Sequence, residues 1–502
     1  MASEVELKLA LAREDEGALR AAAALAGIPA STRRMVALYF DTPRHDLAHA
    51  RIALRLRREG RRWIQTLKSA GRSTGGMHER SEWEFERTRA SIDLSLFADT
   101  PLAQVEDAGT LHERLVEVFR VDSTRTTWEI APWPGTRIEV ALDRGHVVAR
   151  GRAEDFCEVE IERKEGDPGA AFDLASRLLE ELDLRPSGIT KAERGYRLAL
   201  RRRLAPVKAA EIALDPKLTI AGAARVVIGA ALDQLQANGE GVLATTNPEF
   251  VHQARVALRR MRSAMKTFRS AIGAQRAQAW RRAFGELGTA LGTARDWDVL
   301  GTETLPRVLA AYGDPGMRST VLAAATRRRR GERESARAAI RSRASAVIIL
   351  ELARWLALEE EAAVDAATGS LVEFAVKRIR KRHKLLLADA AELEKLTPAE
   401  RHQVRIDTKR LRYKVDAMAS LFPERRLERY LGVLGALQDA LGHANDATTA
   451  GRLLAELDPR EPFAAFARGW FAAQEAGDPM VFGLLRDNLA DAPRFWRHAA
   501  RS

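Results

Sequence analysis

The segment EVELK at residues 4–8 places charged side chains at every second position of a predicted strand. Successive side chains of a strand point to opposite faces, so Glu4, Glu6 and Lys8 share one face and Val5 and Leu7 the other. Taken alone, the segment is typical of a solvated edge strand. Carboxylates and an amine in one row could also hold a metal ion beside a phosphate group.

The same alternation recurs in the segments 51–58, 62–69, 80–87, 136–145 and 156–164. The charged faces carry Arg55 and Arg57; Arg80, Glu82 and Glu84; Glu139 and Asp143; and Glu158, Glu160 and Glu162. The opposite faces are apolar and must be buried, so the charges face either outer solvent or the lumen of a closed antiparallel barrel. Like charges along one strand repel one another without counter-ions, and we therefore favour the lumen.

These residue types describe a metal–phosphate site. Carboxylates such as Glu4, Glu6, Glu158 and Glu160 suit Mg²⁺ or Mn²⁺. The basic side chains suited to phosphate oxygens are Lys8, Arg55, Arg57, Lys68, Arg80, Arg125 and Lys191. The sequence has no Gly-x-x-x-x-Gly-Lys loop, which excludes a P-loop enzyme. Phosphoryl transfer needs positioning and charge neutralisation, and these residues could supply both.

Length and composition limit the number of domains, the kind of partner and the cellular compartment. A chain of 502 residues predicts two or three domains, and a net charge of +12 predicts an anionic partner such as nucleic acid, a membrane surface or polyphosphate. The single cysteine, Cys157, excludes an internal disulfide and fits a reducing cytoplasm. No apolar run is long enough to span a membrane, so we expect a cytoplasmic protein without a membrane partner.

The hydrophobic periodicity changes along the chain. Strands dominate up to about residue 165, with helices expected at 15–26, 168–183 and 188–200, the last capped by Thr190. Prolines 206 and 216 mark a linker, and almost everything beyond it has helical periodicity. We expect a domain at 1–200, a linker at 201–216 and a helical domain at 217–502.

The helical half is internally duplicated. HQARVALRRMR begins at residue 252 and HQVRIDTKRLR at 402, while ALGTARD begins at 290 and ALGHAND at 440. Both pairs are offset by 150 residues, so an intact unit was duplicated. Each copy, at about 217–345 and 365–500, should be a small antiparallel helical bundle.

A cationic stripe follows each copy of the first motif at helical spacing. It contains His252, Arg255, Arg259, Arg262, Lys266 and Arg269 in the first copy, and His402, Arg405, Lys409 and Arg412 in the second. A third basic run, 376–384, adds Lys377, Arg380, Lys381 and Lys384. A solvated face would explain one such helix, but duplication favours a shared groove for a linear polyanion. Nucleic acid is disfavoured because aromatic stacking platforms are missing from these helices. Asp296 and Asp446 are expected to pair with the cations and hold the helices in register.

The helical half, over about 212–502, resembles the CHAD domains, which are associated with polyphosphate binding. The resemblance rests on HQARVALRRMRSAMKTF, LGTARDWDVL, HQVRIDTKRLRY and LQDALGHANDA. It implies phosphate contacts by His252, Arg255, Arg259, Arg262, His402, Arg405, Lys409, Arg410 and Arg412, to which the third run adds Lys377 and Lys381. Asn445 stands where the first copy has Arg295, so the halves are not equivalent.

The first 200 residues are similar to the CYTH superfamily of triphosphate tunnel enzymes. The shared motifs are ExExK at 4–8, YFDTP at 39–43, RIALRLRR at 51–58, QTLK at 65–68, EVALDRG at 139–145, CEVEIE at 157–162 and TKAERGYRL at 190–198. The resemblance implies a closed antiparallel tunnel with two divalent ions on Glu4, Glu6, Glu82, Glu84, Asp143, Glu158 and Glu160. Lys8, Arg55, Arg57, Lys68 and Lys191 are the expected catalytic residues. Which carboxylates of the series Glu82/Glu84/Glu86 and Glu158/Glu160/Glu162 bind metal stays open, because the assignment in each series could shift by one strand step.

The predicted protein is a multidomain α+β chain, with a closed antiparallel β tunnel followed by an all-α domain of two duplicated helical bundles. We expect hydrolysis of inorganic tripolyphosphate to pyrophosphate and phosphate with Mg²⁺ as cofactor, Mn²⁺ being the alternative, and binding of long-chain polyphosphate by the helical half. A thiamine triphosphatase or adenylate cyclase is the first alternative, with Trp63 and Trp83 as candidate stacking residues. A non-catalytic polyphosphate-binding scaffold is the second.

Overall fold

The computed structural model describes residues 2–69, 71–105, 108–358, 369–457, 459–476 and 478–498. It divides into two compact units, one of residues 1–205 with 341–359 and one of 206–340 with 360–502. The first division lies close to the predicted linker, and residues 202–214 form no helix or strand. The chain then re-enters the first unit at α12 (Arg343–Leu358).

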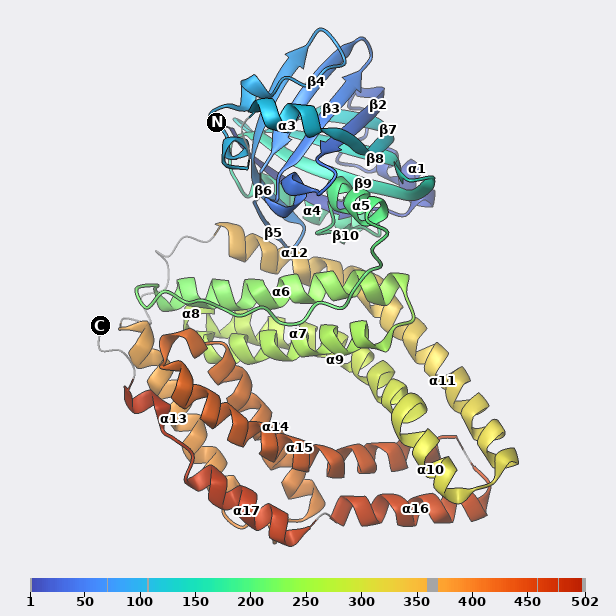
Figure 1. Cartoon of the computed structure of the whole chain (residues 1–502), viewed down its shortest axis with the longest axis vertical. Helices are drawn as coiled ribbons and strands as arrows, with labels where there is room; N and C mark the ends of the chain where they lie inside the picture. Colours follow the sequence, from blue (N-terminus) through green and yellow to red (C-terminus); the bar gives the residue numbers. More distant parts are fainter. Residues whose placement is uncertain are drawn as a thin grey trace. The chain divides into compact units, whose positions relative to one another are not determined.

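The first unit is a closed antiparallel barrel (Figure 1). Around the barrel the strands follow the order β1 (Ala2–Ala10), β9 (Arg152–Glu165), β8 (Arg137–Ala149), β7 (Val116–Ile130), β2 (Ala30–Asp41), β3 (Ala53–Glu59), β4 (Arg62–Lys68) and β6 (Met77–Arg87). β6 pairs with β1 and closes the ring, while β5 (Arg72–Thr74) and β10 (Arg185–Pro186) are short additions. The predicted closed β tunnel is confirmed.

Alternation located six of the eight barrel strands but not β2 or β7. β7 is the longest strand, with 15 residues, and it carries Ser123, Thr124, Thr126 and Thr127 in its middle. Hydroxyl side chains are compatible with either face, so they blur the contrast between apolar and charged positions on which the prediction depended.

Apolar side chains face outward from the barrel and are covered by helices. α1 (Glu16–Ala21), α4 (Ala170–Glu181) and α12 pack against Leu9, Val140 and Ile161, each fully buried. On another side, α2 (Asp46–His49), α3 (Ala108–Arg114) and two 3-10 turns, Leu94–Phe97 and Pro101–Gln104, cover the outward side chains of β3 and β4. The alternate positions, which are charged, are thereby turned into the lumen.

One end of the lumen is filled by α5 (Lys191–Ala199). Thr190 caps α5 and Glu193 completes a capping box, which confirms the predicted N-cap. α5 packs against the inward side chains Tyr39 and Phe119, and a Cβ on Gly195 would lie only 2.1 Å from the Phe119 ring. Glycine at this position therefore lets α5 approach the barrel closely, and the first residue of α5, Lys191, borders the remaining lumen.

The second unit is helical. Its helices are α6 (Ile220–Ala244), α7 (Pro248–Thr267), α8 (Arg269–Ile272), α9 (Ala274–Val299), α10 (Leu305–Tyr312), α11 (Pro315–Arg341), α13 (Leu371–Asp389), α14 (Pro398–Asp416), α15 (Glu424–Ala455), α16 (Glu461–Ala476) and α17 (Pro479–Ala490). The repeated histidine motifs fall on α7 and α14, and the repeated ALG motifs on α9 and α15. α7 packs against α6 and α9, α14 packs against α13 and α15, and α7 contacts α14. None of the described helices is long and apolar enough to cross a membrane.

α12 completes the core of the barrel unit. Ala346, Leu350 and Ala353 are buried in the cluster that contains the outward residues of β1, β8 and β9. Arg354 forms an ion pair with Asp173 of α4, and Figure 1 shows α12 next to the α4 and β10 labels. The core of the first unit thus includes a segment that lies beyond its expected limit at residue 200.

We expect Leu350→Ala to lower the free energy of unfolding of the first unit by about 2–5 kcal/mol, because it leaves a cavity in a packed core. Val347→Ala is the matched control, since Val347 lies on the same helix and is 37% exposed. The measurement is a urea titration in which hydrogen–deuterium exchange of the β9 amides reports unfolding. Equal stability of the two variants would contradict a supporting role for α12.

Candidate functional site

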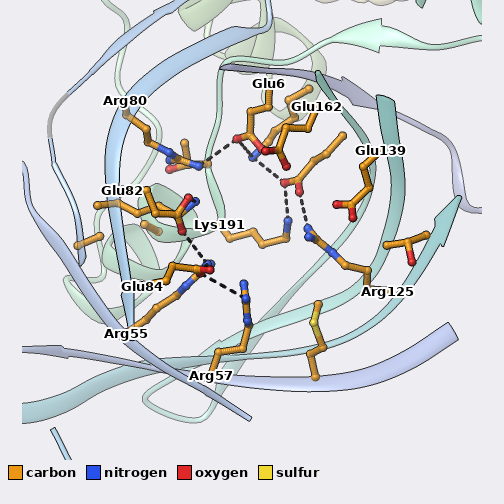
Figure 2. Close-up of a pocket in the computed structure, with 18 of the residues that line it drawn as sticks. Glu6, Arg55, Arg57, Arg80, Glu82, Glu84, Arg125, Glu139, Glu162 and Lys191 are labelled. Atoms are coloured by element: carbon orange, nitrogen blue, oxygen red, sulfur yellow. Dashed lines mark hydrogen bonds and ion pairs between the residues drawn. The ribbon is translucent and has the colours of Figure 1, made fainter. Parts of the chain in front are cut away.

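A charged cavity of about 350 Å³ occupies the lumen. Nine cationic residues line it, Lys8, Arg33, Arg55, Arg57, Lys68, Arg80, Arg125, Lys164 and Lys191. Eight carboxylates line it with them, Glu6, Glu59, Glu82, Glu84, Glu129, Glu139, Glu160 and Glu162. Figure 2 shows the labelled side chains, from the surrounding strands and, for Lys191, from α5, pointing toward one shared space. The two signs nearly balance, so each charge can find a partner inside the lumen.

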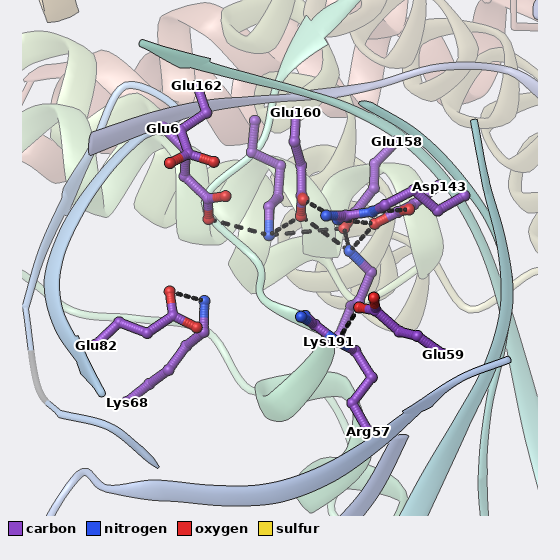
Figure 3. Close-up of polar contacts among 12 residues, drawn as sticks. Glu6, Arg57, Glu59, Lys68, Glu82, Asp143, Glu158, Glu160, Glu162 and Lys191 are labelled. Atoms are coloured by element: carbon purple, nitrogen blue, oxygen red, sulfur yellow. Dashed lines mark hydrogen bonds and ion pairs between the residues drawn. The ribbon is translucent and has the colours of Figure 1, made fainter. Parts of the chain in front are cut away.

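Asp143, Glu158 and Glu160 form an acidic cluster in which one oxygen of each lies within 4.8 Å of the others. Strand register produces this cluster, because Asp143 of β8 lies opposite Glu158 of β9. The ammonium of Lys191 joins the three carboxylates, at 2.6 Å from Asp143 Oδ2, 2.5 Å from Glu158 Oε1 and 2.9 Å from Glu160 Oε1 (Figure 3).

Lys8 and Arg125 approach the same cluster from neighbouring strands. Lys8 Nζ lies 3.2 Å from Glu160 Oε1 and 3.6 Å from Glu158 Oε1. Arg125 grips Asp143 with two hydrogen bonds, from Nε to Oδ1 at 2.7 Å and from Nη2 to Oδ2 at 2.6 Å, and it also donates to Glu160. Three cations therefore compensate three carboxylates at this end of the lumen.

The pairing shifts the protonation equilibria in opposite directions. Burial alone would lower the pKa of Lys191, but Asp143, Glu158 and Glu160 outweigh it and hold the pKa well above its ordinary value. Burial alone would raise the pKa of Glu160, yet Lys191, Lys8 and Arg125 bring it well below its usual range. Lys191 and Glu160 therefore both stay ionised at neutral pH.

A second set of charges lies on β3, β4 and β6. Lys68 Nζ is 2.9 Å from Glu82 Oε2, and Arg55 Nη2 is 3.4 Å from Glu82 Oε1. Arg57 contacts Glu84 at 3.3 Å and Glu59 at 2.7 Å, while Arg80 Nη2 donates to Glu6 at 3.0 Å. These pairs are less buried, with Glu84 41% exposed, so a ligand in the cavity can reach them.

The structure brings all seven predicted phosphate-binding residues to the cavity lining. Of the predicted metal ligands, Glu6, Glu82, Glu84 and Glu160 line the cavity, while Asp143 and Glu158 are buried in the acidic cluster. The side chain of Glu4 lies outside the described residues. Glu86 is absent from the described lining, which favours Glu82 and Glu84 within their series.

Several lining residues were not predicted as site residues. They are Arg33, Tyr39, Glu59, Glu129 and Lys164. Glu139 and Glu162 also line the cavity, on the faces that alternation assigned to the lumen, with Glu162 as the open alternative within its series. Neither Trp63 nor Trp83 is among the described lining residues, and Trp83 packs outside the barrel.

The acidic cluster fits a hard divalent cation by its donor atoms. Asp143, Glu158 and Glu160 offer only carboxylate oxygens, the ligands that Mg²⁺ and Mn²⁺ prefer. The same oxygens are paired with Lys191, Lys8 and Arg125 in this structure. A metal ion would therefore compete with these cations for the carboxylates.

The second unit carries a separate basic groove of about 530 Å³. Its cationic lining comprises Arg259, Arg262 and Lys266 of α7, Arg281 of α9, Arg378, Lys381 and Arg382 of α13, and Arg405, Lys409, Arg410 and Lys414 of α14. Helices from both copies of the repeat contribute, as the duplication predicted. We call this surface the basic groove.

The basic groove differs in part from the predicted polyanion-binding set. Arg259, Arg262, Lys381, Arg405, Lys409 and Arg410 line it, whereas His252, Arg255, Lys377, His402 and Arg412 are not among the described lining residues. On α13 the cationic lining residues are Arg378, Lys381 and Arg382, without Lys377. Successive side chains of a helix lie about 100° apart around its axis, and the basic run alone does not predict which of them face the groove.

Two of the predicted cations instead bind the repeated aspartates. Arg255 Nη1 lies 3.0 Å from Asp296 Oδ1, and Arg405 Nη2 lies 3.5 Å from Asp446 Oδ1. The predicted pairing of Asp296 and Asp446 with the cationic helices is confirmed. These pairs join α7 to α9 and α14 to α15 in equivalent positions.

The pKa shifts predict acid destabilisation of the barrel unit. In the unfolded chain Asp143 and Glu160 regain their ordinary pKa values of 3.8 and 4.5, whereas Arg125 and the lysines lower both in the fold. The unfolded state therefore binds protons first, and stability present above about pH 5 is lost as pH falls through the folded pKa values.

We expect the free energy of unfolding to decline steeply between about pH 5 and about pH 3, and to decline less in Asp143→Asn, which lacks one of the linked carboxylates. Urea titrations of both proteins across this range provide the measurement. If the free energy of unfolding of the two proteins fell equally with pH, the contribution assigned to Asp143 would be contradicted.

Comparison with known proteins matches a different domain family to each part of the chain. Residues 2–196 match the CYTH domain family and residues 226–455 match the CHAD domain family. An inorganic triphosphatase of Haemophilus influenzae is 32% identical over 162 residues, which is 32% of this chain and 44% of that protein, so less than half of the relative's length is spanned. The crystal structure of the CHAD domain from Ricinus communis is 34% identical, with 58% of this chain and 98% of that chain covered and a TM-score of 0.51. The chain therefore belongs to the proteins that join a CYTH domain to a CHAD domain.

Proposed function

We propose that the barrel unit hydrolyses inorganic tripolyphosphate to pyrophosphate and phosphate, and that the basic groove binds long-chain polyphosphate. The observation that carries the first part is the joint lining of one cavity by nine cations and eight carboxylates. Cations alone would bind an anion. The added carboxylates give the same cavity a place for divalent ions, which suits metal-assisted phosphoryl transfer.

The cations lie on two sides of the cavity. Lys8, Arg125 and Lys191 surround the acidic cluster, and Arg55, Arg57, Lys68 and Arg80 lie on β3, β4 and β6. A triphosphate between them would accept hydrogen bonds from both sets, so the chain is held at several phosphates at once. Arg55 has a buried Nε without a hydrogen-bond partner among the described residues, which leaves this donor available to a phosphate oxygen. Arg57 Nε instead lies 2.7 Å from Glu59 Oε1.

Asp143, Glu158, Glu160 and Glu6 are the residues we assign to Mg²⁺, with Mn²⁺ as the alternative. When bound, such an ion neutralises phosphate charge and lowers the pKa of water. The carboxylates would then release Lys8 and Lys191, whose ammonium groups are positioned to stabilise the negative charge of the departing pyrophosphate.

The aromatic content of the lining favours an inorganic substrate over a nucleotide or thiamine triphosphate. Tyr39 is the aromatic residue among the described lining, and its ring is stacked on Phe119 at a centroid distance of 4.4 Å. One face of the Tyr39 ring is therefore already occupied. A substrate panel of tripolyphosphate, ATP and thiamine triphosphate tests this preference directly.

We expect Glu6→Gln to lower kcat/KM for tripolyphosphate by about a hundredfold or more, because it removes a charge from the metal–phosphate site. The assay is phosphate release by the full chain with Mg²⁺. Glu86→Gln is the matched control, since Glu86 carries the same side chain on β6 outside the described lining and should leave kcat/KM unchanged. Equal activity of wild type and Glu6→Gln would refute the proposed site, and absence of phosphate release from the wild type would favour the scaffold alternative.

The second part of the proposal rests on the excess of positive charge in the basic groove, whose described ion pairs are made with two carboxylates, Asp407 and Asp446. Among its described lining residues none carries a carboxylate. The buried Nε atoms of Arg259, Arg262, Arg281, Arg382 and Arg405 also have no hydrogen-bond partner in the described structure. A phosphate chain would supply both the missing charge and the missing acceptors.

We expect Arg281→Ala to weaken binding of long-chain polyphosphate about tenfold, the loss of one charge-assisted hydrogen bond. Arg282→Ala is its matched control, because Arg282 is the next residue on α9 and is exposed outside the described lining. Binding is measured by calorimetry on the full chain. If both variants lose equal affinity, the effect is one of net charge and the assigned groove is wrong.

A further inference from the structure

The basic groove holds more positive charge than its surroundings compensate. Seven arginines and four lysines line it. Guanidinium groups do not lose their protons at accessible pH, so their mutual repulsion must be relieved elsewhere. Only the lysines can become neutral, and only a bound anion can neutralise the groove without the loss of protons.

Lys409 lies where the charges of several helices converge. Arg405 of its own helix and Arg255 and Arg259 of α7 face it, and Asp446 of α15 is the opposing carboxylate. Asp446 is already paired with Arg405 at 3.5 Å, so it compensates Lys409 only in part. Burial, followed by these arginines, lowers the pKa of Lys409 to about 7.

Lys414 lies five residues further along α14 and is likewise surrounded by cations. Arg378 and Arg382 of α13 face it, as does Lys266 of α7. The carboxylate of Asp407, on the same helix, is shared between Arg382 and Arg410. Burial and the neighbouring cations lower the pKa of Lys414 to about 8.

We propose that the basic groove binds phosphate chains together with protons, which Lys409 and Lys414 take up as the chain enters. This inference rests on the proposed binding of polyphosphate by the groove. Without ligand, the two amines are largely neutral in mildly alkaline solution. A polyanion brings negative charge beside them, restores the ammonium forms and so gains two further charge-assisted contacts.

The linkage fixes the sign of the pH dependence. Above about pH 8 the free groove lacks protons that the complex holds, so affinity falls as pH rises, by about tenfold or more per pH unit. Below about pH 6 both amines are already protonated and affinity becomes nearly independent of pH. The groove would hold polyphosphate firmly in neutral or acidic conditions and release it in alkaline ones.

Calorimetry with long-chain polyphosphate and EDTA on the full chain tests the inference. At pH 8, titrations in buffers of different ionisation enthalpy should show uptake of about one to two protons per groove. In Lys409→Arg/Lys414→Arg, charge is retained but neither side chain can gain a proton, so uptake should fall close to zero and affinity at about pH 9 should exceed that of wild type. Lys381→Arg, in the same groove, is the matched control and should keep the wild-type uptake.

The outcomes separate this inference from the proposed function. Binding with the same observed heat in all buffers, or unchanged proton uptake in the double arginine variant, overturns proton coupling while polyphosphate binding stands. If polyphosphate does not bind at about pH 6 and does not bind at about pH 8, both the proton coupling and the proposed polyphosphate binding are overturned. The pH profile of wild-type affinity is a second measurement that needs no variant, and a flat profile between about pH 7 and about pH 9 also overturns the coupling.

Discussion

Buried charge must be compensated, and this requirement governs the barrel unit. An isolated ammonium or carboxylate in the lumen would cost several kcal/mol of desolvation, so each one is placed beside a partner. Lys191 touches three carboxylates, and Arg125 holds Asp143 with two hydrogen bonds. Because strand side chains alternate, a charged lumen forces an apolar exterior. The exterior must then be covered, which explains why helices surround the barrel and why α12 is recruited from far along the chain.

In the helical unit, by contrast, the described carboxylates do not balance the buried charges of the basic groove. Three carboxylates outweigh the effect of burial on Lys191 and raise its pKa, whereas burial, together with the surrounding arginines, lowers the pKa of Lys409 to about 7. The lumen is thus electrically balanced without a ligand, and a ligand must exchange partners there. The basic groove is unbalanced without a ligand, and net attraction alone favours an anion. One chain therefore offers phosphate two different kinds of site, one suited to selective positioning and one to retention.

Sequence patterns predicted those features that short-range geometry determines. Alternation with period two placed Lys8, Arg55 and Glu160 on inward faces, since covalent geometry fixes the parity of a strand. Capping chemistry placed the start of α5 at Thr190. Patterns failed where a long-range contact decides the outcome. Nothing local distinguishes Lys377 from Arg378, because only packing against other helices sets the rotation of α13. The hydroxyl-rich middle of β7 has no apolar contrast, and its place between β8 and β2 emerges only from pairing.

The most consequential long-range feature is α12, because it makes the first unit discontinuous in the sequence. A boundary at residue 200 follows from periodicity, yet the barrel core also needs Leu350 and Ala353 from between the two helical repeats. A fragment of residues 1–200 would expose the apolar surface that α12 covers, on the outer face of strands that carry Glu6, Lys8 and Glu160 inward. Loss of activity in such a fragment would report on the fold of the strands as much as on their chemistry. The contribution of the helical unit to catalysis is therefore better separated by substitutions in the basic groove of the full chain, where the barrel core remains intact.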